Sequence, residues 1–501
     1  MKFESQGLQA IAVYQPNLMM LTSELVNKLR FANNAEELMQ LDNTSRNEDQ
    51  VTEWEEHLRD CMETVGHVSQ LYPAEVMGIV LPLFIADRQQ YVHVHECLAA
   101  GADGKPVLTF PTAETQQAVY VVSRDMATMT QVVGRLAGYF TDSLHTTRFS
   151  ESLALAQSLV DTLQYGESNK LYTIDGPFTD VHIQTVFTLK LFGGWFASCC
   201  RAARETPEEH VKFNTMVLST VSCSWQLVIN PPTVDPTLTQ VLLGAAADLL
   251  ATTAMVVRPQ QLLQSPQLDH IIANQSAYMS QPTALRATLC SASVHALLLP
   301  WHGVPEADQH WELREAKFAQ LFGALFGALP AMAQQISEDV QPLCNLLAAV
   351  TRSLGQHGKS SKAIFMKGLS SLLPSILQMF QAYAAYSGPM SAILDLVLAM
   401  FESVATMLPA EFVNQAMQRF LHYFSKEQMQ KLAVPGAESA NQSRILEIFF
   451  AVLKLLVQSR SAVFRQFLGD IILICVDAVY TLTGSAPVGV RQLRHEFWHQ
   501  F

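Results

Sequence analysis

The chain has little positive charge and lacks several common catalytic motifs. Its 501 residues include 32 Lys and Arg against 45 Asp and Glu, which gives a formal net charge of −13. Nucleic-acid phosphates are bound by Lys and Arg, so this balance argues against a nucleic-acid partner and favours basic or neutral protein partners. The patterns GxSxG, GxGxxG and GxxxxGK[ST] are absent. We therefore expect neither an enzyme nor a bound cofactor.

Cysteine pairs with a redox or metal-binding spacing are also missing. The eight cysteines stand singly in apolar helical patterns, apart from the neighbours Cys199 and Cys200, and no CxxC occurs. Adjacent cysteines do not normally bridge, so we expect reduced thiols in a cytosolic or nuclear protein.

Strand patterns and membrane-spanning runs are missing as well. No stretch alternates between apolar and polar residues for long enough to predict a sheet. The best candidate for a membrane span is residues 241–257, but Asp248 interrupts it and it is shorter than the roughly 20 residues that a span requires. We expect a buried helix there and no membrane insertion.

Helical periodicity is what the chain does contain, most clearly in residues 443–480, which predict two helices joined by a short turn. Ser443 is placed to cap the first helix. Apolar residues recur at spacings of three and four in both helices. They are Ile445, Leu446, Phe449, Val452, Leu453 and Leu456, then Phe464, Phe467, Leu468, Ile471, Cys475 and Val479. One such hairpin cannot bury its own apolar face, so it needs similar hairpins stacked on each side.

The same rhythm runs along the chain and predicts an all-α fold. We expect a single continuous α-solenoid over residues 1–501, built from HEAT-like antiparallel helix pairs of the ARM-repeat type that form a curved superhelix. At ~40–47 residues per unit, the length fits roughly eleven units. Loop-like composition places the softer breaks near residues 101–117, 170–180, 230–236, 303–317 and 355–362.

The N-terminal part allows more detailed predictions. Residues 3–31 suggest two helices separated at Pro16, followed by a polar loop over residues 33–50. Thr52 and Glu55 have the spacing of a capping box, which predicts a helix start. The buried stripe of that helix is predicted to be Trp54, Leu58, Cys61, Val65 and Val68. Pro73 is expected to open the next helix, because proline is tolerated in a first turn.

Three clusters are candidate sites. An acidic patch could face a basic partner, although a solvated loop with favourable charge at a helix N-terminus explains it more simply. Its residues are Glu48, Asp49, Glu53, Glu55 and Glu56. His93, His95 and Cys97 resemble metal ligands, but no second ligand pair lies nearby in sequence, so we expect no metal. Residues 355–362 contain Gly-Lys-Ser at positions 358–360 and are interpreted as a flexible basic loop.

Several stretches, in order along the chain, resemble the importin-β superfamily of nuclear transport receptors, and within it an export receptor for profilin–actin. They are Val51–Arg59, Gln131–Phe140, Lys170–Ile174, Ala296–Trp301, Phe420–Gln428, Val463–Leu468 and Cys475–Tyr480. The resemblance implies a HEAT-repeat receptor that holds the GTPase Ran in its GTP form together with a protein cargo. It also implies contact with nuclear pore proteins and shuttling between nucleus and cytoplasm.

Two functional interpretations remain open from the sequence. One is an export receptor, and the other is a HEAT-repeat scaffold for protein assembly without transport; both require only stacked helices. Residues 487–501 predict a last helix with an uncovered apolar face, Leu493, Phe497 and Phe501 included. We therefore expect the chain to be the central to C-terminal part of a longer protein.

Overall fold

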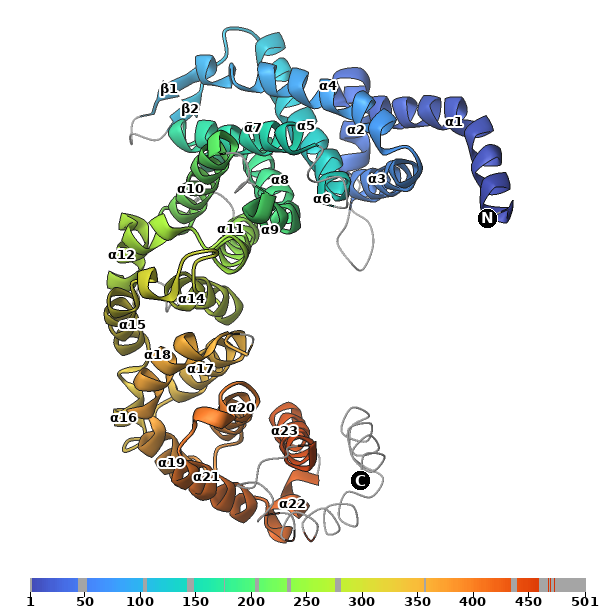
Figure 1. Ribbon diagram of the computed structural model, residues 1–501. Helices are drawn as coiled ribbons and strands as arrows, with labels where there is room; N and C mark the ends of the chain where they lie inside the picture. The colour runs from blue at the N-terminus through green and yellow to red at the C-terminus, as the bar shows by residue number, and fades with distance from the viewer. Residues whose placement is uncertain are drawn as a thin grey trace. The chain divides into compact units, whose positions relative to one another are not determined.

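The chain is described by a computed structural model in which nearly every placed residue is helical (Figure 1). The described residues are 2–43, 52–101, 106–141, 148–174, 176–202, 207–231, 236–274, 281–355, 357–433 and 439–458, with Phe467, Gly469 and Leu473. They divide into two compact units, unit 1 over residues 1–261 and unit 2 over residues 262–501. The all-α prediction is confirmed, and the single continuous solenoid stays a prediction.

Unit 1 is built from two layers of helices around an aromatic core. Helices α5, α8 and α11 pack side by side in chain order, and α4, α7 and α10 cover them. The helices of unit 1 are α1 (Lys2–Lys28), α2 (Phe31–Asn43), α3 (Glu53–Leu71), α4 (Pro73–Tyr91), α5 (Ala113–Arg135), α6 (Gly138–Thr141), α7 (Phe149–Ser168), α8 (Pro177–Leu191), α9 (Gly193–Ala202), α10 (Pro207–Ile229) and α11 (Pro236–Val256).

Short elements complete unit 1. The strands β1 (Leu98–Ala100) and β2 (Pro106–Leu108) form an antiparallel ribbon in which Ala99 faces Val107. Turns of 3₁₀ helix cover Val94–Cys97 and Leu171–Thr173. Among the described residues of unit 1, this ribbon is the only non-helical regular element, and its strands are too short for alternation to reveal them in the sequence.

Aromatic side chains fill the middle of unit 1. Trp195 is fully buried, and its ring centroid lies 5.9 Å from that of Phe149, 5.9 Å from Phe192 and 5.7 Å from Phe213. These residues come from α7, α9, α10 and the α8–α9 turn, so one indole ties both layers together. Burial of side chains of this size contributes about 1.5–3 kcal/mol each.

Unit 2 repeats the two-layer plan. Helices α14, α17, α20 and α23 pack side by side in chain order, while α12, α15 and α18, and then α16, α19 and α21, form the other layer. The helices are α12 (Pro266–Ala273), α14 (Thr283–Leu298), α15 (Trp311–Phe326), α16 (Leu329–Met332), α17 (Val340–Ser353), α18 (Lys359–Ser370), α19 (Leu373–Ala382), α20 (Ser387–Ser403), α21 (Ala410–Tyr423), α22 (Lys426–Ala433) and α23 (Ser439–Gln458), with 3₁₀ turns at Gln260–Gln264, Glu306–Asp308 and Ala405–Met407.

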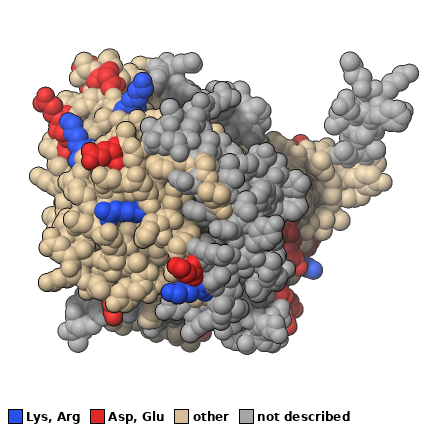
Figure 2. Space-filling view, turned by 90° about the horizontal axis from the view of Figure 1, so that it is seen from below, with Lys and Arg blue, Asp and Glu red and all other residues tan. Residues whose placement is uncertain are grey.

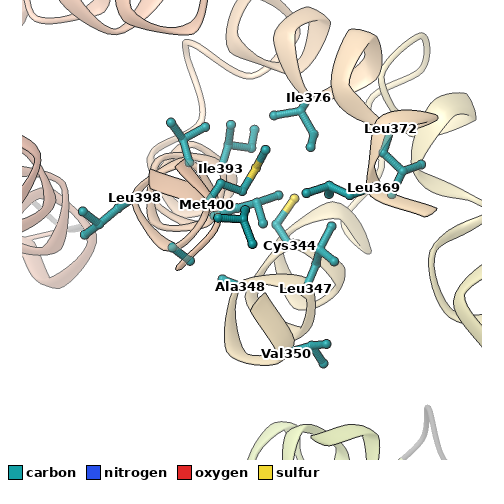
Figure 3. Packing of buried hydrophobic residues seen from close by; sticks show 14 of the residues in the cluster. Cys344, Leu347, Ala348, Val350, Leu369, Leu372, Ile376, Ile393, Leu398 and Met400 are labelled. Carbon is teal, nitrogen blue, oxygen red and sulfur yellow. The ribbon is translucent and has the colours of Figure 1, made fainter. Parts of the chain in front are cut away.

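The core of unit 2 lies between its layers. Figure 3 shows Cys344 and Leu347 of α17 directed towards Leu369 of α18 and Ile376 of α19, beside Met400 of α20. Helix α20 is buried on nearly all sides, because it has α17 and α23 as neighbours in its own layer and α19 in the other. This explains why its sequence is apolar over almost its whole length.

Several local predictions are confirmed. Thr52 accepts a hydrogen bond from the Glu55 N–H, and the Glu55 carboxylate accepts one from the Thr52 N–H, which is the predicted capping box. The predicted stripe of α3 is buried, and Trp54 lies edge-on to Phe31 with ring centroids 5.1 Å apart. Pro73 opens α4 as expected.

Other local predictions are wrong, each because helical packing outweighs a local signal. Pro16 does not separate two helices but lies inside α1. The loop predicted over residues 33–50 is largely the helix α2, whose first N–H groups are capped by a carboxylate distant in sequence, described below. Ser443 is not a cap, since α23 begins at Ser439. The second helix of that hairpin and the predicted last helix lie outside the described residues.

Predicted loops also prove shorter than expected. Helix α5 begins at Ala113, α8 at Pro177, α15 at Trp311 and α18 at Lys359, inside segments predicted as breaks. For α15, the buried Arg314 explains why the helix begins inside the predicted break. Its side chain is fully buried, donates to the Leu297, Leu299 and Gln309 carbonyls at 2.6–2.8 Å, and lies over the ring of Trp301.

Helix α11 is long and apolar enough to cross a membrane by length and composition. Half of its most apolar window is buried inside the protein, where α11 contacts α8, α9 and α10. Its Asp248 forms an ion pair with Lys190 of α8. The bent pair α18 and α19, with 52° between them, passes the same test when taken together.

Candidate interaction surfaces

The predicted acidic patch lies at the N-terminus of α3, as far as the described residues show it. Glu53 and Glu55 are exposed and Glu56 is half-buried, while Glu48 and Asp49 lie outside the described residues. Glu55 is committed to the capping box. Three carboxylates in the first helical turn favourably oppose the positive end of the helix dipole. The local structure therefore accounts for part of this charge without a partner.

Carboxylates from three helices converge near this patch around Arg124 of α5. The guanidinium pairs with Asp42 of α2 and lies 5.4 Å from the centre of the Phe31 ring. Burial raises the pKa of Asp180 of α8, Arg124 lowers it, and the charges of Asp42 and Glu55 raise it. More carboxylates thus lie near the patch than the sequence indicates, and Arg124 neutralises part of their charge. Nothing in the sequence links residues so far apart.

A buried polar cluster fixes the turn between α1 and α2. Asp125 of α5 accepts hydrogen bonds from the Phe31 and Ala32 N–H groups, so it caps α2 from another helix. Arg30 pairs with Asp87 of α4 and lies 4.0 Å from Asp125. Burial raises the pKa of Asp125 to about 6, against the hydrogen bonds from Ala32 and Phe31, which lower it. The cluster positions the helices that carry the acidic patch.

A neutral histidine lies in the same unit between α7 and α8. His182 is buried, and its Nδ1 lies 2.9 Å from the Phe178 carbonyl, to which it donates. Burial lowers its pKa to about 4. Gly166 leaves the room for this ring, because a Cβ there would lie 2.0 Å from Nε2. Protonation would place an uncompensated charge in this interior.

In unit 2, a row of charges crosses α17, α20 and α23. Arg352 forms two hydrogen bonds to the Asp395 carboxylate at 2.8 and 2.9 Å, and Arg444 donates to the same carboxylate at 2.9 Å. Glu402 lies 3.3 Å from Arg352. The two partners of Asp395 lie 43 and 49 residues away in sequence. Because this spacing is close to one helical repeat, it is a signal that sequence reasoning could have used.

Two of the grooves among the described residues lie between neighbouring helices of the covering layers. One, of about 430 Å³, lies between α19 and α21 in unit 2, and the other, of about 270 Å³, lies between α7 and α10 in unit 1. Among the described residues on the face in Figure 2, most are uncharged, and blue and red side chains lie scattered between them.

The predicted weak motifs take on structural roles. His93 and His95 flank a 3₁₀ turn, where the His93 ring contacts Glu96 at 2.9 Å and the His95 ring contacts the Val92 carbonyl at 2.8 Å. In the part of the chain that the structure describes, no group of three His, Cys, Asp or Glu side chains is arranged to hold a metal ion. Lys362 donates to the Gly355 and Ser403 carbonyls, which anchors the predicted basic loop.

Comparison with known proteins identifies the relatives. No protein-family model matches the chain. It is 26% identical to exportin-6-A of Xenopus laevis over 98% of its own length and 45% of that protein. It is 26% identical to exportin-6 of Homo sapiens over 95% of the chain and 43% of that protein, and 22% identical to exportin-6 of Dictyostelium discoideum over 97% and 46%. The chain spans less than half the length of these curated relatives, and over nearly its own whole length it is homologous to exportin-6.

Proposed function

We propose that this chain is part of a nuclear export receptor. It binds a protein cargo together with Ran-GTP in the nucleus and releases the cargo in the cytoplasm, so it shuttles between the two compartments. Similarity to exportin-6 proteins along almost the whole chain, in vertebrates and in an amoeba, carries this proposal. The resemblance of the ordered stretches points to profilin–actin as the cargo and to nuclear pore proteins as further contacts.

The arrangement of helices supports the same function. Each unit has two layers whose helices follow one another in chain order, which is the local pattern of a HEAT-type repeat array. We propose that the repeats form one continuous curved solenoid over the chain. Such an array presents a long row of helices to a partner and can contact a large protein without any deep pocket.

The acidic residues before and within the first turn of α3 are our candidate for a partner contact, and we call them the acidic surface. We define it as Glu48, Asp49, Glu53, Glu55 and Glu56, as predicted from the sequence. Residues 1–72 contain 12 Asp and Glu against 5 Lys and Arg, a net charge of −7 out of −13 for the chain. A surface of this sign attracts basic segments and speeds their association.

A pull-down separates the export receptor from the alternative scaffold. The 501-residue chain is immobilised and incubated with nuclear extract, with Ran locked in the GTP state, with Ran-GDP, or without Ran. An export receptor enriches actin and profilin with Ran-GTP alone. A set of partners that is the same in all three conditions would contradict export and support a scaffold.

The acidic surface is tested in the same assay with the double variant Glu53→Lys and Glu56→Lys, which leaves the capping residue Glu55 intact. The control is Glu338→Lys with Asp339→Lys in unit 2, where both side chains are exposed. The first variant should lower cargo recovery several-fold, and more at low salt than at high salt. Equal losses in the two variants would show that net charge, rather than this surface, matters.

A further inference from the structure

The larger groove has an apolar floor and mostly polar residues along its edges. Its volume is about 430 Å³, and it lies between α19 and α21. Leu373, Leu377 and Phe412 form the floor and are buried. The residues at its rims are Ser370, Pro374, Gln378, Pro409, Glu411, Gln415 and Arg419. A volume of this order can accept one or two side chains of a partner.

The two charged residues of the groove stand at opposite ends of one rim. Glu411 and Arg419 are eight residues apart on α21, which corresponds to about 12 Å along a helix. Glu411 accepts a hydrogen bond from Gln415, and Arg419 donates one to the Leu377 carbonyl. Both partners are uncharged, and the guanidinium has four further N–H groups.

The two charged residues of the groove differ in this respect from several charged residues of the same unit that are paired. On the same unit, Lys317 pairs with Asp269, Lys367 with Glu315, and Arg352 with Asp395. Within the part of the chain that the structure describes, neither Glu411 nor Arg419 takes part in an ion pair. An anion and a cation about 12 Å apart, with an apolar floor between them, define a polar direction along the groove.

We propose that this groove binds a short segment of a partner protein, about 8–12 residues long, in one orientation. The segment places an acidic side chain against Arg419 and a basic side chain against Glu411, and one or two apolar side chains between them enter over Leu377 and Phe412. The two charges select the direction of the segment, and the apolar floor supplies affinity. This inference does not depend on Ran or on export.

A charge-swap selection tests the proposal on the whole 501-residue chain. A displayed library of random 12-residue peptides is selected against the wild type and against the double variant Glu411→Arg with Arg419→Glu, which keeps the net charge. The control variant is Lys212→Glu, at the smaller groove of unit 1. The wild type and the control should enrich one order of basic, apolar and acidic residues, and the double variant should enrich the reverse order.

One enriched peptide is then measured by fluorescence anisotropy. Arg419→Glu should weaken binding about tenfold, and replacing the acidic residue of the peptide by Lys should restore it. Arg419→Gln retains a donor for the Leu377 carbonyl, so it separates charge from folding and should weaken binding a few-fold. Identical peptide sets from the wild type and the double variant, or no enrichment over a blank surface, would overturn the proposal.

Discussion

Units 1 and 2 hold their buried polar groups differently beneath similar helical layers. Unit 1 encloses carboxylates and a histidine: Asp87 is 3% exposed, Asp125 1% and His182 1%. Unit 2 encloses Arg314, which is fully buried, and Asp395, which is held by two arginines. It also buries His295 and His357, whose rings contact each other at 3.0 Å. A guanidinium that donates to several carbonyls can stay charged inside a protein, whereas a carboxylate or an imidazole with few partners shifts its pKa.

The difference predicts where the protein responds to pH. Burial moves the pKa of Asp125 to about 6 and that of His182 to about 4. In unit 2, burial lowers the pKa of Arg314 to about 10 and raises that of Cys290 and Cys344 to about 12. Acid stability between pH 4 and 6.5 should therefore depend on unit 1 more than on these groups of unit 2.

The largest expected effects come from removing one buried aromatic ring from each unit. Trp54→Ala removes the indole beside Phe31, and Phe365→Ala removes the ring that contacts Phe318 and Phe322. Each change should cost about 3–5 kcal/mol of unfolding free energy, because it loses apolar burial and leaves a cavity. Hydrogen exchange should show lost protection centred on the unit that carries the change. Equal losses in both units would show that the two units unfold together.

The buried arginine of unit 2 is the next test. Arg314→Met keeps the length of the side chain but leaves the Leu297, Leu299 and Gln309 carbonyls without their donor. We expect a loss of about 2–4 kcal/mol in denaturant unfolding, because each unsatisfied buried carbonyl costs about 1–3 kcal/mol and the apolar chain recovers part of the loss. Arg352→Met, at a half-exposed guanidinium, is the control and should cost less. A larger effect for the control would contradict this account of Arg314.

The pH dependence of unit 1 can be separated into two opposing parts. The folded-state pKa of His182 lies below the ordinary value of 6.5, so its contribution to stability is present above pH 6.5 and is lost as the pH falls towards 4. The folded-state pKa of Asp125 lies above the ordinary value of 3.8, so its contribution grows as the pH falls from about 6 towards 4. Each part is on the order of 1–3 kcal/mol.

The variants His182→Gln and Asp125→Asn separate these parts. Compared with the wild type, His182→Gln should lose less stability between pH 6.5 and 4, and Asp125→Asn should lose more. Unfolding free energies at pH 7, 6, 5 and 4 provide the measurement. The same pH slope in both variants as in the wild type would mean that neither group titrates in this range.

The smallest effect should come from the charge row of unit 2. In a double-mutant cycle of Asp395→Asn with Arg444→Gln, we expect a coupling of about 1 kcal/mol, because the carboxylate is mostly buried while Arg444 is half-exposed. The exposed pair Glu315–Lys367 should give about 0.3 kcal/mol. Both couplings should fall at high salt, and a coupling that is unchanged in 1 M salt would contradict an electrostatic origin.

Much of the helical content follows from the sequence, because helices are specified locally. Thr52 and Glu55 cap α3 through bonds three residues apart, and the stripe that begins at Trp54 follows the helical period. The predictions fail where a residue far away in sequence determines where a helix begins. Helix α2 starts where Asp125, more than ninety residues away, caps it, and no local pattern around Phe31 shows this.

The candidate sites, too, were partly predictable from the sequence and partly dependent on the tertiary structure. The sequence determined which residues carry charge, and so identified the acidic run around Glu55. Only the tertiary structure brought Asp42, Arg124 and Asp180 to that run, and only it left Glu411 and Arg419 unpaired beside a groove. The physical reason is the sequence distance over which each interaction acts. Capping and helical periodicity act over one or two turns of the chain, whereas burial and charge pairing depend on which helices contact one another.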